Sequence, residues 1–493
     1  MRPTLFLLLP LLLAGCMGTE LVRPPAPVAE QWTGVTPASP PENESRPASL
    51  IAWRDFFTDP RLQQLITIAL ENNRDLRVAA ARLEAARAEH GISRTDRLPA
   101  IEGNLTQSNQ GWPAELATSG KPFTYRRADF SLGVASFELD LWNRLGSLSD
   151  SAKYAYLATE SAQRTVRLSL ISEIASTYYT QLELVERLEM SRRNLEMREK
   201  AYALNLLAFE QGFASSVETQ TALGLVEAAR GEIIQLRRTQ ANASNKMDYL
   251  LGKKAENLPE GRALAAQNID GGLFPGLPAE VLLQRPDVAA AEQRLRSAHA
   301  SVNAARAAFL PKILLTAGLG LASRSLASLF ASGGNAWNFQ PSMSMPLFDW
   351  GKTQGGVDLA EARKNIAVAE YEKTLQESFR EVADLLAARE ALMEQRRIAD
   401  TQASINEQRL GSFRARQQEG VMSLLNVFDA EREWLSSRQN AIQIQRQQLE
   451  NAALLYKALG GGEALPAETG NALALGSPPQ SVVGHASLGT QLQ

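Results

Sequence analysis

Two long stretches of the chain, residues 147–211 and 355–419, contain no proline and repeat their apolar residues at the seven-residue spacing of coiled coils. In the first stretch these residues include Leu188, Leu195, Tyr202 and Phe209, and in the second Leu375, Phe379, Val382, Leu386 and Met393. About 65 helical residues extend roughly 95 Å, which is longer than an ordinary globular domain. Gly212 or Gly420 then interrupts each stretch before a second helical segment, so the pattern predicts two long helical hairpins.

A different pattern precedes each helical hairpin, where apolar and polar residues alternate as in a strand that is buried on one face. The clearest series are Ile313, Leu315, Ala317, Leu319 and Leu321, and then Phe339, Pro341, Met343, Met345 and Leu347. The alternation predicts strands at about residues 312–322 and 338–347, and at about 100–108 and 129–141 earlier in the chain. Strands of about ten residues can cross a bilayer as staves of a barrel. Taken alone, they also fit a soluble β-hairpin packed on the helices.

The chain contains the same order of elements twice. At an offset of 212 residues, Asp75, Arg82 and Leu83 match Asp287, Arg294 and Leu295; later, at an offset of 208, Trp142, Gly212 and Leu251 match Trp350, Gly420 and Leu459. Each copy begins with a predicted helix, at residues 60–94 or 286–309, which ends at a Leu-Pro pair. The change of four between the two offsets predicts a longer loop in the first copy, between Pro99 and Trp142.

These observations predict a mainly α-helical fold with membrane β-strands, built from two tandem repeats of helix, β-hairpin and long helical hairpin. The first repeat covers residues 51–252, with its tip near residue 212, and the second covers residues 285–460, with its tip near residue 420. Residues 253–284 form the segment between the repeats, which we expect at the equator of the molecule. Residues 461–493 are rich in Gly, Ala, Ser and Pro and are expected to form a flexible tail.

The N-terminal residues predict export and lipid attachment. Residues 1–15 combine a positive start with a short Leu-rich run, as in a signal peptide. Small residues then precede Cys16, the only cysteine, as in a bacterial lipoprotein cleavage site; a plain signal peptide with an incidental cysteine is the alternative. Met17 stands where an aspartate would favour retention in the inner membrane, so we expect the outer membrane. Residues 16–50 are Pro-rich, which is typical of an extended tether from the lipid.

The composition favours neither a nucleic-acid-binding protein nor an enzyme. The chain has 51 basic and 54 acidic residues, without the basic excess of nucleic-acid-binding proteins. Its three histidines, His90, His299 and His485, are scattered, and none pairs with another histidine or a cysteine at metal-ligand spacing. No glycine-rich phosphate-binding motif occurs. We therefore expect no catalytic residue, no metal and no cofactor.

One copy of the chain supplies four candidate membrane strands, and this number has a consequence for assembly. A four-stranded sheet has two open edges, which cannot stay unpaired in hydrocarbon. Two copies would close eight strands around an interior filled by side chains, whereas three would close twelve around a lumen. We therefore expect a homotrimer whose long helices continue below the strands as a tube.

At the start of each repeat the sequence resembles the TolC/OprM family of outer-membrane factors. The residues that carry the resemblance are Trp53-Arg54-Asp55-Phe56-Phe57 with Leu62, Leu65, Asn73 and Asp75-Leu76, then Gln284-Arg285-Pro286-Asp287 with Ala291-Glu292 and Leu295, and Pro346-Leu347-Phe348-Asp349-Trp350-Gly351. With Cys16, the chain is similar to the NodT-like efflux lipoprotein branch. This resemblance implies a homotrimer whose twelve-strand β-barrel continues into a long periplasmic α-helical barrel. It also implies an adaptor protein and an inner-membrane pump of the resistance-nodulation-division (RND) type as partners.

The resemblance assigns roles to the ends of the helical hairpins that lie farthest from the strands. The turns that would contact the adaptor are Gly212, Phe213, Ala214 and Ser215 in the first repeat and Gly420, Val421, Met422 and Ser423 in the second. Leu425, Asp429 and Arg432 follow at i, i+4 and i+7 and share one helix face. In the family, matching positions form the closed periplasmic gate. The alternatives are ordinary helix turns and a solvated ion pair.

Other functions fit parts of the same pattern. A periplasmic coiled-coil scaffold lipoprotein without a pore would explain the helices but not the alternating strands. An exit duct of a type I protein secretion system and a metal-efflux duct would share the channel architecture. The exported substrate cannot be predicted from these residues, because the inner-membrane pump selects it.

Overall fold

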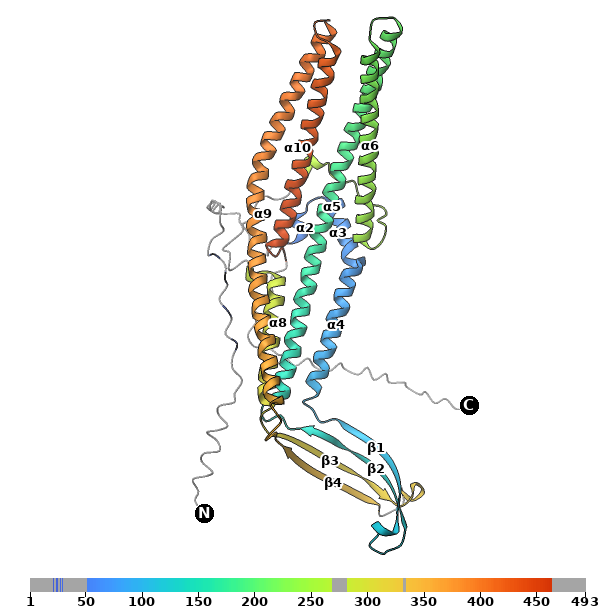
Figure 1. Cartoon of the computed structure of the whole chain (residues 1–493), viewed down its shortest axis with the longest axis vertical. Helices are drawn as coiled ribbons and strands as arrows, with labels where there is room; N and C mark the ends of the chain where they lie inside the picture. Colours follow the sequence, from blue (N-terminus) through green and yellow to red (C-terminus); the bar gives the residue numbers. More distant parts are fainter. Residues whose placement is uncertain are drawn as a thin grey trace, which may run out of the picture.

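The computed structural model describes residues 51–267, 282–330 and 334–462, together with Leu21, Pro24, Pro27 and Ala29. The predicted signal peptide, Cys16, most of the tether and nearly all of the C-terminal tail lie outside these residues. The described part is a long rod of helices with a four-stranded sheet at one end (Figure 1).

The two predicted repeats are confirmed in the order of the elements. The first repeat contains α2 (Trp53–Phe56), α3 (Pro60–Asn72), α4 (Arg74–Thr95), β1 (Ile101–Trp112), η4 (Ala114–Leu116), β2 (Phe123–Glu138), α5 (Arg144–Glu210) and α6 (Ser216–Leu251). After η5 (Leu264–Ala266), the second repeat contains α8 (Pro286–Ala307), β3 (Lys312–Ser323), η6 (Leu326–Ser328), β4 (Asn335–Ser344), α9 (Lys352–Gln418) and α10 (Leu424–Ala458). The corresponding helices α4 and α8 have 22 residues each, and α5 and α9 have 67 each.

The helices α5 and α9 each extend about 100 Å and connect the two ends of the molecule. Beyond mid-height, α5 pairs with α6 and α9 pairs with α10 (Figure 1). Between mid-height and the sheet, α4 contacts α5, α5 contacts α8, and α8 contacts α9, so these four helices form one layer. No helix in the described part of the chain is both long enough and apolar enough to cross a membrane.

The single helix predicted at residues 60–94 is wrong, because the chain breaks at Asn73 between α3 and α4. The Asn73 side chain accepts a hydrogen bond from the backbone N–H of Leu76 at 2.9 Å and so caps α4. Its amide also donates to the carbonyl of Leu250, near the end of α6, at 2.8 Å. Gly252 approaches Asn72 so closely that a Cβ there would lie 2.4 Å from the Asn72 carbonyl oxygen. The break therefore joins the start of α4 to the end of α6.

The strands differ from their predicted limits, most of all in the first hairpin. β1 continues to Trp112 and β2 begins at Phe123, so residues expected in the connecting loop instead pair with each other. The connections between the strands have similar lengths in the two hairpins, and the longer loop predicted for the first copy is therefore wrong. The additional residues that change the offset between the copies lie in β2 instead. This strand has 16 residues, against 10 in β4, and contains a bulge between Val134 and Phe137.

The largest apolar core lies at mid-height, where α2 and α3 pack against the long helices. Phe56 stacks on Tyr456 of α10 with ring centroids 4.4 Å apart, and the Tyr456 hydroxyl donates to the Ile51 carbonyl at 2.7 Å. The buried carboxylate of Asp59 accepts hydrogen bonds from the Tyr178 hydroxyl and from the backbone N–H of Arg262. In this core the N-terminal helices pack against the long helices of both repeats. The core lies between the sheet at one end of the molecule and the hairpin turns at the other.

Candidate channel wall, gate and docking tips

The four-stranded sheet has one apolar and one polar face, as its pairing register shows. Ile101 and Leu105 of β1 share a face with Leu132 of β2, Leu319 of β3 and Trp337 of β4. Each of these side chains is more than half exposed in the single chain. The opposite face carries Asn104, Thr106, Arg127, Asp129, Thr316, Asn338 and Gln340. No described helix covers either face (Figure 1), and such a sheet is suited to a wall between lipid and water.

Both outer strands of the sheet have an unpaired edge within the described chain. β1 pairs only with β2, and β4 pairs only with β3. All three pairings are antiparallel, so β1 and β4 run in opposite directions. An antiparallel pairing of β4 with β1 of another copy is therefore possible without reversing any strand.

Glycines allow close approach of the two central strands on the polar face. A Cβ at Gly320 of β3 would lie 2.0 Å from the Phe130 carbonyl oxygen, and a Cβ at Gly133 of β2 would lie 2.2 Å from the Ala317 carbonyl oxygen. Glycine at these two positions therefore permits a close approach of the β2 and β3 backbones that a side chain would prevent.

The two hairpin turns at the far end of the molecule are built in the same way. Gly212 and Gly420 have φ angles of 78° and 74°, a left-handed conformation that glycine adopts without strain. Ser215 and Ser423 then cap α6 and α10, where each hydroxyl accepts a hydrogen bond from the backbone N–H three residues later. The turns are consequently fixed at both sides by standard helix-end interactions.

Each turn presents one apolar side chain to the surroundings. Phe213 is 87% exposed and Val421 is 73% exposed, whereas Ala214 and Met422 are partly buried. Phe213 and Val421 are therefore the apolar side chains that the two turns leave most accessible to another protein.

The predicted gate residues lie on one exposed face of α10. The Arg432 guanidinium is 3.4 Å from the Asp429 carboxylate, and Leu425, one turn before Asp429, is 60% exposed. Val427 and Ala430 point the other way and pack in a cluster with α9. The structure thus brings Asp429 and Arg432 together. In the single chain this exposed pair contributes under about 1 kcal/mol to stability.

A buried carboxylate beside this face was not predicted from the sequence. Glu431 is buried and lies 3.5 Å from Arg414 of α9. Burial raises its pKa, while the positive charges of Arg414 and Arg198 oppose that shift. The sequence did contain a signal for this burial. Glu431 lies four residues from both Val427 and Leu435, which are buried, so it shares their face of the helix. Glu431 therefore connects α10 to α9 and faces α5.

The family-like Arg285-Pro286-Asp287 motif forms an ion-pair network at mid-height. The buried Arg285 guanidinium donates to Asp287 at 2.7 Å, to Glu381 of α9 at 2.6 Å and to the Ala458 carbonyl at 2.9 Å. Lys457 adds a second cation 3.1 Å from Glu381. Burial alone would raise the pKa of Glu381, but the charges and hydrogen bonds of Arg285 and Lys457 outweigh it and lower the pKa. The motif is structural, because it joins α8, α9 and the end of α10.

The described residues contain no group of three His, Cys, Asp or Glu side chains that could hold a metal ion. His90 stacks on Tyr156, with ring centroids 6.3 Å apart, at the contact between α4 and α5. Its position is therefore explained by helix packing.

A sheet with one exposed apolar face and two open edges, joined to helices of about 100 Å with exposed apolar tips, defines a subunit of a membrane conduit. The chain belongs to the outer membrane efflux protein family, whose model matches residues 65–253 and 277–461.

Individual relatives match over nearly the whole chain. The toluene efflux pump outer membrane protein TtgC of Pseudomonas putida is 37% identical over 453 residues, which cover 92% of this chain and 93% of the relative. The cation efflux system protein CusC of Escherichia coli is 36% identical over 461 residues, which cover 92% of this chain and 97% of the relative. The crystal structure of the open state of the MtrE outer membrane channel of Neisseria gonorrhoeae superimposes with a TM-score of 0.83 at 34% identity, covering 91% of this chain and 99% of that one.

Proposed function

We propose that three copies of this chain form an outer-membrane channel that carries substrates from the periplasm to the exterior within a tripartite efflux system. The open-edged sheet is the observation that carries the proposal. In water its apolar face and its two edges would remain exposed, which is costly. Pairing β4 with β1 of the next copy closes a barrel, and twelve strands leave a lumen where eight do not. The apolar face then meets lipid, and the polar face lines the lumen.

The helices continue the conduit into the periplasm. The layer of α4, α5, α8 and α9 has open sides at α4 and α9, which three copies can join into a tube of twelve helices. Lipid attached to Cys16 would serve as a second anchor, because the barrel itself already holds the protein in the membrane.

The turns at Gly212–Ser215 and Gly420–Ser423 are the proposed contacts for a periplasmic adaptor, which connects the channel to an inner-membrane RND-type pump. The exposure of Phe213 and Val421 supports this assignment. Both turns lie at the end of the rod opposite the sheet, where a partner on the periplasmic side would meet them (Figure 1).

The exposed face of α10 is the proposed gate. In a trimer, three Leu425 side chains form an apolar constriction near the axis, and three Asp429 carboxylates form an acidic ring beside it. Arg432 partly neutralises that ring and can pair across the contact between copies. Opening then requires these three faces of α10 to separate.

Planar-bilayer conductance of the purified full-length protein tests the channel and its gate. The unmodified trimer should conduct weakly, and Asp429→Ala with Arg432→Ala should raise the resting conductance. Glu394→Ala is a matched control, because Glu394 forms an exposed i,i+3 pair with Arg397 on α9. If membrane-inserted protein carries no current even with both gate residues replaced, the chain is not a channel.

A periplasmic scaffold without a pore leaves the exposed apolar face of the sheet unexplained. The relatives are named for efflux, of toluene in one case and of cations in another, and not for protein secretion. These names differ in cargo, which supports the view that the outer component does not by itself select the substrate.

A further inference from the structure

Within one chain, the first repeat meets the second along a seam that runs from the strands into the helices. At the strand end of this seam, the Leu139 backbone N–H donates to the Ile313 carbonyl at 2.9 Å. Three residues later, the Trp142 indole N–H donates to the Pro311 carbonyl at 2.7 Å. These two bonds hold the exit of β2 against the start of β3.

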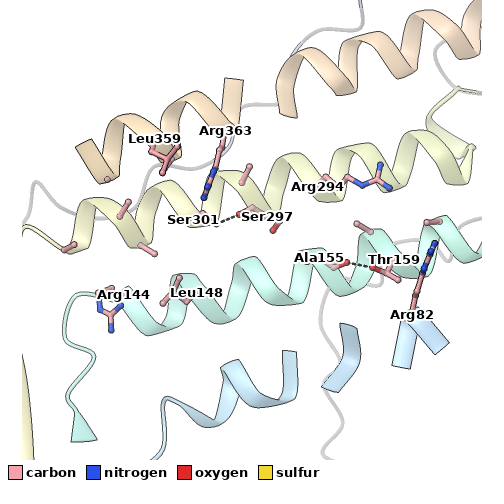
Figure 2. A pocket seen from close by; sticks show the side chains of 18 residues that line it. Arg82, Arg144, Leu148, Ala155, Thr159, Arg294, Ser297, Ser301, Leu359 and Arg363 are labelled. Carbon is pink, nitrogen blue, oxygen red and sulfur yellow. Dashed lines mark hydrogen bonds between the residues drawn. The ribbon is translucent and has the colours of Figure 1, made fainter. Parts of the chain in front are cut away.

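The same seam continues between α5 and α8, where small side chains line both helices (Figure 2). The Ser151 hydroxyl lies 3.0 Å from that of Ser297 and 2.9 Å from that of Ser301. Ala158 lies seven residues after Ser151, on the same side of α5. Ala304 likewise lies seven residues after Ser297, and both alanines are buried. They border a cavity of about 880 Å³, so the seam has space for larger side chains.

The corresponding positions on the two outer helices of the layer carry large apolar side chains. Ala158 corresponds to Ile366 of α9 at the offset of 208, and Ile366 is 58% exposed. Ala304 corresponds to Ile92 of α4 at the offset of 212, and Ile92 is 66% exposed. Other exposed apolar side chains follow on the same faces at multiples of seven residues, Leu359 on α9 and Val78 on α4. The positions that are buried between the repeats therefore form an exposed apolar stripe on each outer helix.

The exit of β4 also lacks the contacts that its counterpart in the first repeat makes. Leu347 is the counterpart of Leu139 at the offset of 208. Trp350 is likewise the counterpart of Trp142, and Leu347 and Trp350 are each 89% exposed. The Trp350 backbone has a φ of 57°, which a bulky residue rarely adopts. β4 ends at Ser344, opposite the first residue of β3, so no strand of the described chain lies beside the segment that follows.

The pairing of β2 with β3 predicts how β4 would pair with β1 of another copy. Phe137 of β2 pairs with Leu315 of β3. The counterpart of Phe137 is Met345, and the counterpart of Leu315 is Gly103. From this pair, each step back along β4 is one step forward along β1, because the strands are antiparallel.

The predicted register agrees with the faces of the two strands. Met343 lies opposite Leu105, and both belong to the apolar face. Ser342 lies opposite Thr106, and both belong to the polar face. A shift of one residue would place apolar side chains beside polar ones. Pro341 has no N–H, so one bond is missing from this ladder, and proline is tolerated at such an edge of a subunit's sheet.

We propose that the contact between copies repeats the seam between the two repeats. β4 of one copy pairs with β1 of the next copy with Ser342 opposite Thr106. The Trp350 indole donates to the Pro99 carbonyl of the next copy, since Pro99 is the counterpart of Pro311. The exposed stripe of α9 packs against that of α4. This inference rests on the proposed trimeric channel and adds the register and the residues of its contact.

The geometry of the ladder makes the register testable by disulfide formation. The directly opposite residues Leu139 and Ile313 form a hydrogen-bonded pair. Such pairs alternate with non-bonded ones, and Ser342 lies five positions before the counterpart of Leu139, so its pair with Thr106 is non-bonded. The Cα atoms of a non-bonded pair are about 4.5 Å apart, which a disulfide can span.

Oxidation of the full-length T106C/S342C protein in outer membranes should therefore give dimers and trimers that a reducing agent separates. The matched variants T106C/Q340C and T106C/S344C carry the second thiol on the same face but two residues away. At about 7–8 Å from Thr106 they should form at least about tenfold less of these products. Each single variant, which also carries Cys16, should form none.

The tryptophan bond is tested by Trp350→Phe, which keeps an aromatic ring but removes the N–H. It should lower the temperature at which the trimer dissociates in detergent by at least about 2 °C, because three such bonds are lost per trimer. Trp337→Phe is the control, since Trp337 is also exposed on β4 but lies away from its exit. It should leave that temperature unchanged.

The outcomes separate this contact from the channel itself. If T106C/Q340C or T106C/S344C links more readily than T106C/S342C, the register is refuted while the trimeric channel stands. If Trp350→Phe dissociates at the temperature of the unmodified trimer, the tryptophan contact is refuted. If none of the cysteine pairs links, β4 does not meet β1, and the proposed channel fails together with this inference.

Discussion

The Asn73 side-chain amide donates a hydrogen bond to the Leu250 carbonyl at 2.8 Å, and Arg285 makes the equivalent bond to the Ala458 carbonyl at 2.9 Å. Asn73 corresponds to Arg285 at the offset of 212, and Leu250 corresponds to Ala458 at the offset of 208. Each repeat therefore uses the residue at the start of its membrane-proximal helix to hold the end of its return helix. The two junctions occupy corresponding positions, but the donor is a neutral amide in the first copy and a charged guanidinium in the second.

Replacing Asn73 with alanine should destabilise the first repeat. The change removes both the cap of α4 and the buried bond to Leu250, which together should cost about 1–3 kcal/mol. Asn72→Ala is the control, because the Asn72 amide bonds only to Ile68 within α3. Thermal unfolding of the purified protein should show a clear loss of stability for the first variant. Equal losses for the two variants would contradict this account of the junction.

The Arg285 network should make stability depend on pH at the acidic side. The folded-state pKa of Glu381 lies below its ordinary value of 4.5, so its ion pairs stabilise the fold above that pH and are lost as the pH falls through the lowered pKa. Glu381→Gln should therefore cost about 1–3 kcal/mol near pH 7, with the difference shrinking below about pH 4.5. Glu407→Gln, at an exposed position of α9, should show no such trend. The melting temperature of each variant measured from pH 7 to pH 3 gives the comparison, and a difference that stays constant with pH would argue against the network.

Adding a methyl group at Gly320 should disturb the barrel wall. The new Cβ would lie 2.0 Å from the Phe130 carbonyl oxygen, so β2 and β3 would have to move apart. We expect Gly320→Ala to lower the temperature at which the trimer dissociates in detergent, at a cost of about 1–3 kcal/mol. Gly111→Ala in β1 meets no atom within 4 Å and should leave that temperature unchanged. A Gly320 variant with normal thermal stability would show that the strands do not approach as closely as described.

Charged residues at the hairpin turns should weaken adaptor binding. Phe213→Asp and Val421→Asp each place a carboxylate where an apolar contact is proposed, and each should weaken binding at least about tenfold. Leu204→Asp is the control, because Leu204 is similarly exposed on α5 but lies away from the turn. Binding of a purified periplasmic adaptor protein, chosen because the unmodified trimer binds it, to immobilised trimers is the measurement. Normal affinity in both turn variants would exclude these turns as the contact.

The long helices were predictable because their signal is repeated many times. Heptad spacing without proline marked α5 and α9, and Gly212 and Gly420 marked the turns. The break at Asn73 was missed, because its cause is a contact with Leu250, far away in the sequence. Helical periodicity on both sides of Asn73 gave no sign of that contact.

Two other features were also not predicted from the hydrophobic pattern. The start of β2 at Phe123 was missed because its first residues are largely polar and become a strand only by pairing with β1. Glu431 was missed because a carboxylate in an apolar stripe is normally read as a surface residue.

The central claim is that β4 of one copy pairs with β1 of the next, and cross-linking of these strands tests it most directly. Thr106→Cys in β1 and Gln340→Cys in β4 place thiols near the middle of the two open edges, on the polar face. A flexible bismaleimide applied to membrane-inserted protein should link the double variant into dimers and trimers, and into nothing larger. The single variants should stay monomeric, which also controls for Cys16. An absence of linked species, or a ladder that continues past three copies, would contradict a closed trimeric barrel.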